Sequence, residues 1–366
     1  MDGVDLSIIK SDGEGQFTHI LDAYFKFNPS LHEKLINLRN KLFTDEDLSK
    51  YSKELNELEK NFTLFNAQVV ESVLKNFKDN VDLIGFHGQT ILHDPIKSFS
   101  KQLGDGKLLS QLTKKIVINN FRQEDLNNGG QGAPLTPIFH KLISEIIKKK
   151  YDIKFPLNII NIGGITNVTQ VYINKVNKEL SLRAFDIGPG NCLIDEWVRK
   201  NSKKNFDEDG YLAKSGKINE LILNQALENF EINSYERSLD IKDFDISFVK
   251  GLSLEDGCAT LTRFSSSLIL RGLEYVNNLN ENFPTLQLFC GGGRKNKFLI
   301  ETINKYFMKK TTKLENIDNY GFDGDFIESQ AFAYLCIRSF LNLPNSFPST
   351  TRCLKPSVGG TVIKNF

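Results

Sequence analysis

Three apolar segments of this chain each run directly into a glycine turn, and this repeated unit constrains the fold more than any other feature. The pairs are residues 158–162 before Gly163-Gly164, residues 182–185 before Asp186-Ile-Gly-Pro-Gly-Asn191, and residues 286–290 before Gly291-Gly292-Gly293. Open α/β sheets bind ligands beside the carboxyl ends of their strands, where glycine lets the backbone approach closely. The three units together predict a nucleotide held between loops at one edge of a sheet, although each turn alone is equally typical of an ordinary connection.

Composition narrows the class of protein. The chain has 366 residues, enough for two domains, and 46 Lys and Arg balance 45 Asp and Glu. The nearly equal numbers of basic and acidic residues give no sign of a positively charged surface that would bind nucleic acid. No apolar run reaches the roughly 18 residues of a membrane span. The five cysteines are far apart, with no Cys-x-x-Cys pair, which argues against a zinc or disulfide framework. We therefore expect a cytoplasmic protein that binds neither nucleic acid nor membrane.

Strand and helix patterns alternate along both halves of the chain. In the first half we expect a hairpin over 4–20, a helical region over 29–78, and strands at 81–84 and 115–118. In the second half we expect strands at 157–162, 168–173, 180–185 and 286–290, with helices over 193–200, 218–230, 254–277 and 325–341. This alternation predicts an α/β fold with a parallel core, and the hairpin that opens each half hints at a duplicated fold. The stretch 129–137 before a helix at 138–150 is interpreted as a hinge.

Taken together, these motifs resemble the anhydro-N-acetylmuramic acid kinase family, bacterial cell-wall-recycling enzymes of the superfamily that joins sugar kinases, actin and heat-shock chaperones. The ordered matches run nearly end to end: Asp2-Gly-Val-Asp5, Gly85-Phe-His-Gly-Gln-Thr90, Phe121-Arg122, Gly129-Gly-Gln-Gly-Ala-Pro-Leu135, Asn161-Ile-Gly-Gly-Ile-Thr-Asn167, Ala184-Phe-Asp-Ile-Gly-Pro-Gly-Asn191, Glu255-Asp256 with Ala259-Thr-Leu261, Cys290-Gly-Gly-Gly293 with Asn296, and Gly321-Phe-Asp-Gly-Asp325 with Glu328 and Ala331-Phe-Ala333. Chance does not produce so many turns in one order.

The resemblance implies an α/β fold of two actin-like (RNase H-like) domains with an active-site cleft between them. We expect residues 1–132 and 350–366 in the N-terminal domain and 133–349 in the second. The implied enzyme is an ATP-dependent kinase that hydrolytically opens the ring of 1,6-anhydro-N-acetylmuramic acid and phosphorylates O6, giving N-acetylmuramic acid 6-phosphate and ADP in peptidoglycan recycling. The alternatives are another kinase or phosphatase of the superfamily, a nucleotide-binding chaperone or filament protein, and a homologue with impaired use of ATP. A homodimer stays open.

The resemblance also implies site residues. Asp186 is expected to be the general base that deprotonates water, with helix capping or magnesium ordering as its alternative roles. The nucleotide and phosphate set is Asp2, Gly3, Asp5, Gly163, Gly164, Gly188, Gly291, Gly292, Gly293 and Asn296. Magnesium is expected to bind through the phosphates and one or two carboxylates, such as Asp2 or Asp186.

Four residues are candidates for binding the sugar. A muramic sugar carries a lactyl carboxylate, which Arg122 can pair bidentately. Glu328 can accept hydrogen bonds from sugar hydroxyls or the N-acetyl group, and His87 and Gln89 lie in an expected glycine-bounded loop. The ordinary alternatives are a surface arginine, a solvated glutamate and a core histidine.

The chain departs from the family pattern at two places. Family members usually begin with a short strand and a Gly-Thr-Ser phosphate loop, whereas this sequence starts at Met1-Asp2-Gly3. Either the start is assigned too late or this version is truncated, and we expect weaker binding of ATP than in an extended version. Asn120 stands where the family usually has Asp, which leaves the orientation of Arg122 open.

Overall fold

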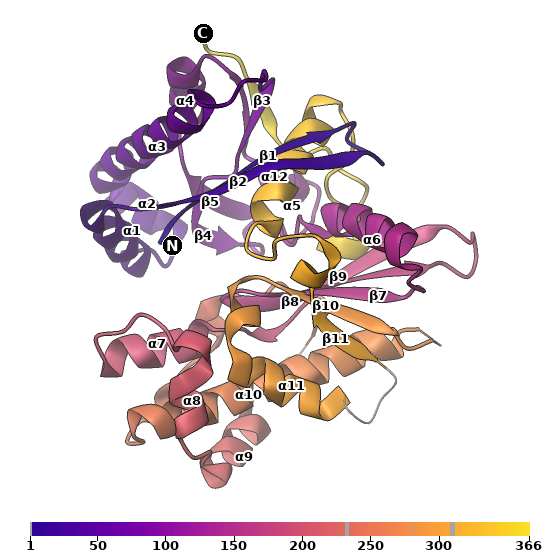
Figure 1. Cartoon of the computed structure of the whole chain (residues 1–366). Coiled ribbons are helices and arrows are strands. Elements are labelled where there is room, and N and C mark those ends of the chain that lie inside the picture. Colours follow the sequence, from indigo (N-terminus) through magenta and orange to yellow (C-terminus); the bar gives the residue numbers. More distant parts are fainter. Residues whose placement is uncertain (1, 231–233, 281, 308–311) are drawn as a thin grey trace. The chain divides into compact units, whose positions relative to one another are not determined.

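The computed structural model describes residues 2–230, 234–280, 282–307 and 312–366 (Figure 1). The chain divides into two compact units: Met1–Phe139 with Glu328–Phe366, and His140–Ile327. These divisions differ from the expected bounds at 132/133 and 349/350, because residues 133–139 and 328–349 belong to the first unit. The expected bounds of the folding domains stay a prediction.

The second unit is built on a five-stranded mixed sheet with the order β11-β10-β7-β8-β9. The strands are β7 (Leu157–Ile162), β8 (Ile165–Ile173), β9 (Leu180–Pro189), β10 (Leu286–Cys290) and β11 (Lys313–Asn316). Strands β7, β8 and β9 form an antiparallel meander, and β10 runs parallel to both β7 and β11. Counted along the chain, the order is third, second, first, fourth, fifth, which is the RNase H-like arrangement. The expected α/β, actin-like fold class is confirmed.

The described α-helices of the second unit are α6 (Pro137–Tyr151, which crosses the division at Phe139), α7 (Cys192–Asn201), α8 (Tyr211–Ser215), α9 (Glu220–Asn229), α10 (Leu254–Asn278) and α11 (Lys297–Phe307). Helix α10 contacts β8 and β9, and α7, α8, α9 and α11 pack against α10. Every residue of β7 and β10 is buried, as expected for parallel strands covered on both faces. The long helix α10 packs against β9, and its Leu273 joins Ile160 of β7 and Phe289 of β10 in one core. The strands that end in the glycine turns are therefore held by a packed core.

The first unit contains three small sheets. Its strands are β1 (Gly3–Ser11), β2 (Phe17–Lys26), β3 (Leu83–Phe86), β4 (Gln89–Asp94), β5 (Phe99–Leu103), β6 (Ile116–Asn119) and β12 (Thr361–Ile363). They pair as β1-β2, β4-β5 and β12-β6-β3, with β3 parallel to β6. The helices are α1 (Pro29–Lys41), α2 (Asp45–Lys50), α3 (Ser52–Leu74), α4 (Gly106–Thr113), α5 (Gln123–Asn127), α12 (Ile327–Phe340) and α13 (Pro348–Thr351). The hairpin that opens this half is confirmed, whereas the β4-β5 hairpin was missed.

Helix α12 connects two of these sheets. Ser329 on α12 shares a 2.6 Å hydrogen bond with Ser7 of β1. One turn further, the helix passes so close to β3 that a Cβ at Gly85 would lie 2.8 Å from the carbonyl oxygen of Phe332. In the second unit β7 lies between β8 and β10, whereas no described strand takes the corresponding place between β1 and β3. The two units thus follow one plan with this difference.

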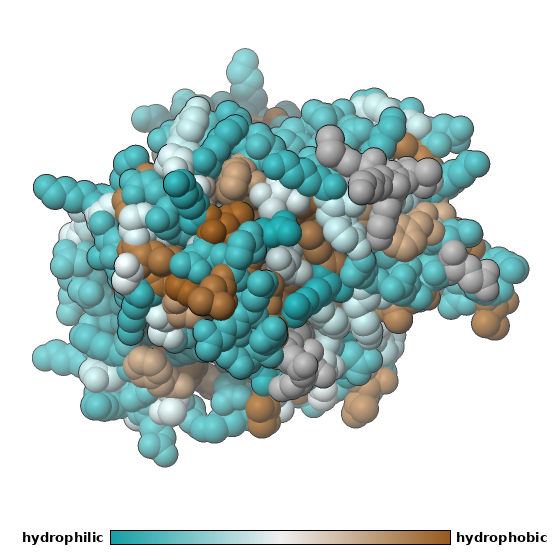
Figure 2. Space-filling model, turned by 90° about the horizontal axis from the view of Figure 1, so that it is seen from below, coloured by the Kyte–Doolittle hydropathy of each residue, from teal (hydrophilic) through white to brown (hydrophobic). Residues whose placement is uncertain are grey.

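The surface is mostly hydrophilic on the face shown in Figure 2, with apolar residues gathered in a few places. In the described part of the chain, no helix is both long and apolar enough to cross a membrane. All five cysteines are buried, and none of them forms a disulfide bond.

Candidate active site

Asp186 lies inside β9 and not at its end, which corrects the sequence-based expectation of a strand that stops at Phe185. The strand continues to Pro189 because a bulge absorbs Ile187: Asp186 pairs with Asn167, and the next paired residue is Gly188 with Thr166. Gly188 takes φ +153°, which side-chain-bearing residues rarely adopt. Asp186 is 9% exposed as a residue, so it is largely shielded from solvent.

Backbone hydrogen bonds join the two glycine turns beside Asp186. The N–H of Asn191 donates to the carbonyl of Gly163 at 2.9 Å, and that of Gly190 donates to Gly164 at 2.9 Å. A Cβ at Gly190 would lie 2.2 Å from the Gly163 carbonyl oxygen, so only glycine permits this approach. The sequence predicted both turns separately, and the structure brings them together.

A segment that the sequence analysis did not single out lies against both features. The backbone N–H of Leu239 donates to a carboxylate oxygen of Asp186 at 2.9 Å. The side chain of Ile241 lies 3.3 Å from where a Cβ of Gly164 would be. Asp240 and Asp243 cap the short helix between them by reciprocal hydrogen bonds, with the N–H of Asp240 donating to Asp243 at 2.8 Å. Only this capping pattern could have marked the segment from sequence.

The third turn follows β10. A Cβ at Gly291 would lie 2.2 Å from the Asn161 side-chain oxygen, and one at Gly293 would lie 2.2 Å from Ile162, both on or next to β7. Gly292 has no atom within 4 Å of its would-be Cβ, so this residue presents open backbone. Asn296 accepts a hydrogen bond from the N–H of Leu299 at 3.1 Å and so caps α11. Because β7, β9 and β10 run in one direction, their turns meet at the same edge of the sheet, as predicted.

In the first unit, Arg122 and His87 are brought together. Arg122 Nε donates to His87 Nε2 at 3.1 Å, and Arg122 Nη1 donates to the carbonyl of Gly132 at 2.7 Å. His87 Nδ1 lies 2.9 Å from the Gly88 carbonyl, which fixes the tautomer with the proton on Nδ1. Burial, with the positive charge of Arg122, lowers the pKa of His87 to about 3. Two N–H groups of the arginine are thus oriented by a neutral histidine and a loop carbonyl.

The loop that supplies Gly132 is anchored by Asp125, which is 1% exposed. One carboxylate oxygen of Asp125 accepts from the N–H of Gly132 at 2.7 Å, and the other accepts from the hydroxyl of Thr351 at 2.6 Å. Asn120 has φ +57°, a left-handed conformation that asparagine and aspartate tolerate better than most residues. Its replacement of Asp therefore keeps the backbone geometry that leads into Arg122.

The other predicted residues of the first unit are placed as follows. Gln89 begins β4 and so lies in a strand and not in a loop, because its segment pairs with β5. Glu328 is exposed in the first turn of α12. Asp2 is exposed at the start of the described chain, and Gly3 and Asp5 lie in β1. Burial, with the neighbouring Asp2 carboxylate, raises the pKa of Tyr24 to about 12.

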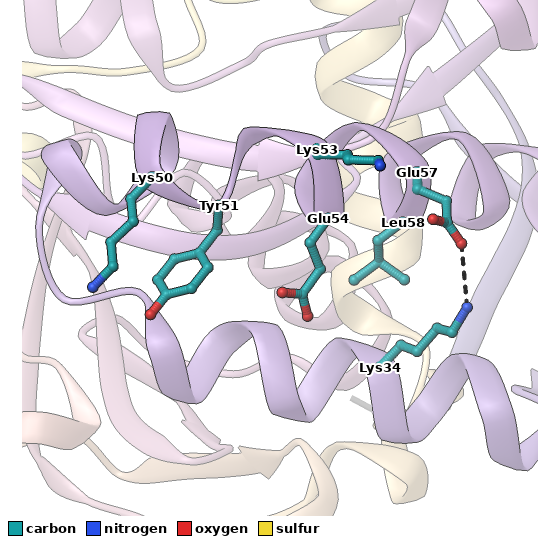
Figure 3. A pocket seen from close by; sticks show the side chains of 7 residues that line it. All are labelled: Lys34, Lys50, Tyr51, Lys53, Glu54, Glu57 and Leu58. Carbon is teal, nitrogen blue, oxygen red and sulfur yellow. Dashed lines mark hydrogen bonds and ion pairs between the residues drawn. The ribbon is translucent and has the colours of Figure 1, made fainter.

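A hollow of about 390 Å³ lies among helices α1 to α3, lined by Lys34, Lys50, Tyr51, Lys53, Glu54, Glu57 and Leu58 (Figure 3). None of the predicted site residues lines it. Lys34 pairs with Glu57 across it at 3.4 Å, and both side chains are exposed. Such an exposed pair contributes little to stability, and no residue of the glycine turns lines the hollow. Within the described ranges, no group of three or more His, Cys, Asp or Glu is arranged to hold a metal ion.

Comparisons with known proteins agree along the whole chain. Residues 1–365 match the family model described as anhydro-N-acetylmuramic acid kinase. The anhydro-N-acetylmuramic acid kinase of Pelagibacter ubique (strain HTCC1062) is 50% identical over 368 residues, covering 100% of this chain and 96% of the relative. That of Agrobacterium fabrum (strain C58) is 34% identical over 372 residues, with the same coverage of 100% and 96%. One solved structure, component A of (R)-2-hydroxyglutaryl-CoA dehydratase from Acidaminococcus fermentans, is 13% identical with a TM-score of 0.34 over 64% of this chain and 74% of that chain, a likeness too slight to bear on the fold.

Proposed function

The chain belongs to the anhydro-N-acetylmuramic acid kinase family, and on that premise we propose that it opens the ring of 1,6-anhydro-N-acetylmuramic acid with water and phosphorylates O6 with ATP. The products are N-acetylmuramic acid 6-phosphate and ADP, as peptidoglycan recycling requires. The observation that carries the proposal is the one edge of the sheet at which the turns after β7, β9 and β10 lie, with Asp186 in β9 beside the two hydrogen-bonded turns that follow β7 and β9. A carboxylate and open backbone N–H groups are what water activation and phosphate binding need.

The proposed reaction begins at Asp186, which accepts a proton from a water molecule. The water oxygen bonds to the anomeric carbon of the sugar, and the bond from that carbon to O6 breaks. The freed O6 attacks the γ-phosphorus of ATP, and ADP leaves with the electron pair of the broken phosphoanhydride bond. No separate acid is needed, because the phosphoryl group captures the leaving oxygen. General-base assistance of this kind contributes roughly 10²–10⁴-fold in rate.

The nucleotide is assigned to the glycine turns. Gly163-Gly164 is proposed to contact the phosphates, and Gly291–Gly293 to lie on the adenosine side. The open backbone at Gly292 supports this, because a ligand can approach it without meeting a side chain. Magnesium ion fits the oxygen-only donors here, and Asp186 or Asp2 would hold it together with the phosphates. The ion would neutralise charge on the transferred phosphoryl group.

The sugar is assigned to Arg122, with His87, Gln89 and Glu328 as further contacts. The hydrogen bonds to His87 and Gly132 support this assignment, because they hold the planar guanidinium in one orientation. A fixed guanidinium pairs a carboxylate bidentately at lower entropic cost than a mobile one. The lactyl carboxylate is the group that distinguishes a muramic sugar from a glucosamine sugar.

Product analysis tests the proposal directly. The purified chain is incubated with ATP, magnesium chloride and 1,6-anhydro-N-acetylmuramic acid, and the products are identified by mass spectrometry. We expect equal amounts of ADP and N-acetylmuramic acid 6-phosphate. An intact anhydro ring in the phosphorylated product, or ADP with no phosphorylated sugar, would contradict the proposal. Gluconate and N-acetylglucosamine serve as substrates for the alternative of a different sugar kinase.

A further inference from the structure

The segment Gly321–Asp325, singled out by sequence but without a role in the proposed reaction, packs against the turn that follows β10. The N–H of Gly291 donates to the carbonyl of Gly324 at 2.9 Å. Gly321 takes φ +88° and lets the chain turn back from η5 (Ile317–Tyr320) toward Asp325. The segment therefore supplies a backbone partner to the first residue of the glycine turn.

The buried side chain of Arg294 stabilises this contact. Its Nε and Nη2 atoms donate to the two carboxylate oxygens of Asp318 at 2.7 and 2.8 Å, a bidentate pair. Its Nη1 atom donates to Asp325 at 2.5 Å and to the carbonyl oxygen of Gly291 at 3.1 Å. The Arg294 side chain is only 5% exposed. One buried guanidinium thus joins two carboxylates to the backbone of the glycine turn.

The fit around the guanidinium is close. A Cβ at Gly324 would lie 2.5 Å from Arg294 Nε, so glycine is needed at that position. The Asp323 carboxylate lies 3.4 Å from Arg294 Nη2 and accepts from the N–H of Asp325 at 2.9 Å, which shapes the segment around the arginine. Lysine offers one compact charge and cannot reproduce this planar set of bonds.

We propose that Arg294 is a positioning residue, which holds the Gly291–Gly293 turn in the conformation that receives the nucleotide. The inference rests on the proposed function, which assigns this turn to the adenosine side of ATP. The Arg294 side chain is buried, and its guanidinium donates to Asp318, to Asp325 and to the carbonyl of Gly291, so we infer that it acts through the turn and not by touching the nucleotide. Loss of the arginine loosens the turn and weakens the binding of nucleotide. It leaves the binding of the sugar and the proposed action of Asp186 as a base unchanged.

Nucleotide affinity in Arg294 variants tests this role. ADP is titrated calorimetrically into the wild type, Arg294→Lys and Arg294→Met without sugar, and KM and kcat are measured for both substrates. We expect the Kd for ADP and the KM for ATP to rise at least about tenfold. The KM for the sugar and kcat at saturating ATP should stay within about twofold of the wild type. Unchanged affinity for ADP, or equal increases in both KM values, would overturn the proposal.

Two further variants separate positioning from folding. Lys214→Met breaks an exposed 3.7 Å pair with Glu301 in the same unit and should leave both nucleotide affinity and melting temperature unchanged. Arg294→Met leaves the carboxylates of Asp318, Asp323 and Asp325 without the guanidinium that pairs with all three. Adding Asp318→Asn removes one of these three like charges, so melting temperature should partly recover while affinity for ADP stays low. If affinity recovers together with stability, the role is structural only. Wild-type turnover tests the proposed function independently, since ADP binding needs no sugar chemistry.

Discussion

The backbone N–H of Leu239 donates a 2.9 Å hydrogen bond to the carboxylate of Asp186, although the two residues are far apart in sequence. A hydrogen bond from a fixed backbone donor restricts the orientation of a carboxylate. Ile241, two residues later, contacts the Gly164 turn, so one short segment touches both the proposed base and the proposed phosphate turn. The relative position of base and phosphate therefore depends on the segment around Leu239.

Replacing Asp186 by asparagine should abolish phosphorylation of the sugar while keeping the fold and the binding of nucleotide. An amide has nearly the shape of the carboxylate and still accepts from Leu239, but it cannot take a proton from water. We expect kcat to fall by at least about 10²-fold. The measurements are turnover, ADP affinity and melting temperature; near-normal turnover would remove Asp186 from the mechanism.

Leu239→Pro removes the one N–H that Leu239 offers to Asp186, whereas Leu239→Ala keeps it. The proline variant should lose about tenfold or more in kcat, because the base is less well oriented, with little change in the KM for ATP. The alanine variant is the matched control, and its kcat should stay close to that of the wild type. Equal losses in both variants would assign the effect to the leucine side chain.

Arg122→Lys should raise the KM for the muramic sugar and leave the KM for ATP unchanged. An ammonium cannot bond His87 and Gly132 in the guanidinium's geometry and still pair a carboxylate bidentately. Loss of a charge-assisted pair of about 1.5–3 kcal/mol corresponds to roughly 10- to 100-fold in KM. The substrate control is 1,6-anhydro-N-acetylglucosamine, which lacks the lactyl group. If Arg122→Lys raises the KM for this control sugar by the same factor, Arg122 does not recognise the carboxylate.

Stability should fall as pH falls from about 6.5 to about 3, in part because of His87, whose pKa burial and Arg122 lower to about 3. Above the ordinary pKa of the imidazole both states are neutral, and stability is complete. Below that pKa the imidazole is protonated in the unfolded chain and stays neutral in the folded chain. The free energy of unfolding therefore falls, by on the order of a few kcal/mol when the pH reaches about 3. His140, whose pKa burial lowers to about 3, acts with the same sign. Urea unfolding of His87→Gln should show a weaker pH dependence than the wild type, and an identical pH dependence would contradict this account.

Local patterns predicted the elements of the site well. Strand β7 has the predicted bounds, and the turns at Gly163, Gly190 and Gly291 occur where glycines follow apolar runs. These features depend on neighbouring residues, through steric limits on the backbone and the alternation of buried positions. Gln89 was misplaced because the β4-β5 hairpin has a four-residue loop without glycine, 95–98, and its strands are mostly polar.

The contacts that orient the site could not be predicted. Asp186 meets Leu239 and Arg294 meets Asp318 and Asp325, in each case through chain segments that only the tertiary fold brings together. No spacing rule connects such residues, and an aspartate in a polar loop has the same local pattern whether or not it binds an arginine. The bulge at Ile187 is likewise set by pairing with β8, so β9 runs further than its apolar residues indicated.

Reaction in ¹⁸O-labelled water tests the central claim, that one water molecule opens the sugar ring and ATP then phosphorylates the freed oxygen. The products are separated and their masses are measured for sugar phosphate, free sugar and inorganic phosphate. The account predicts one labelled oxygen on the anomeric carbon of N-acetylmuramic acid 6-phosphate and no label in its phosphate group. Label in inorganic phosphate, with an unlabelled sugar, would show that water attacks ATP and not the ring, and would contradict the account.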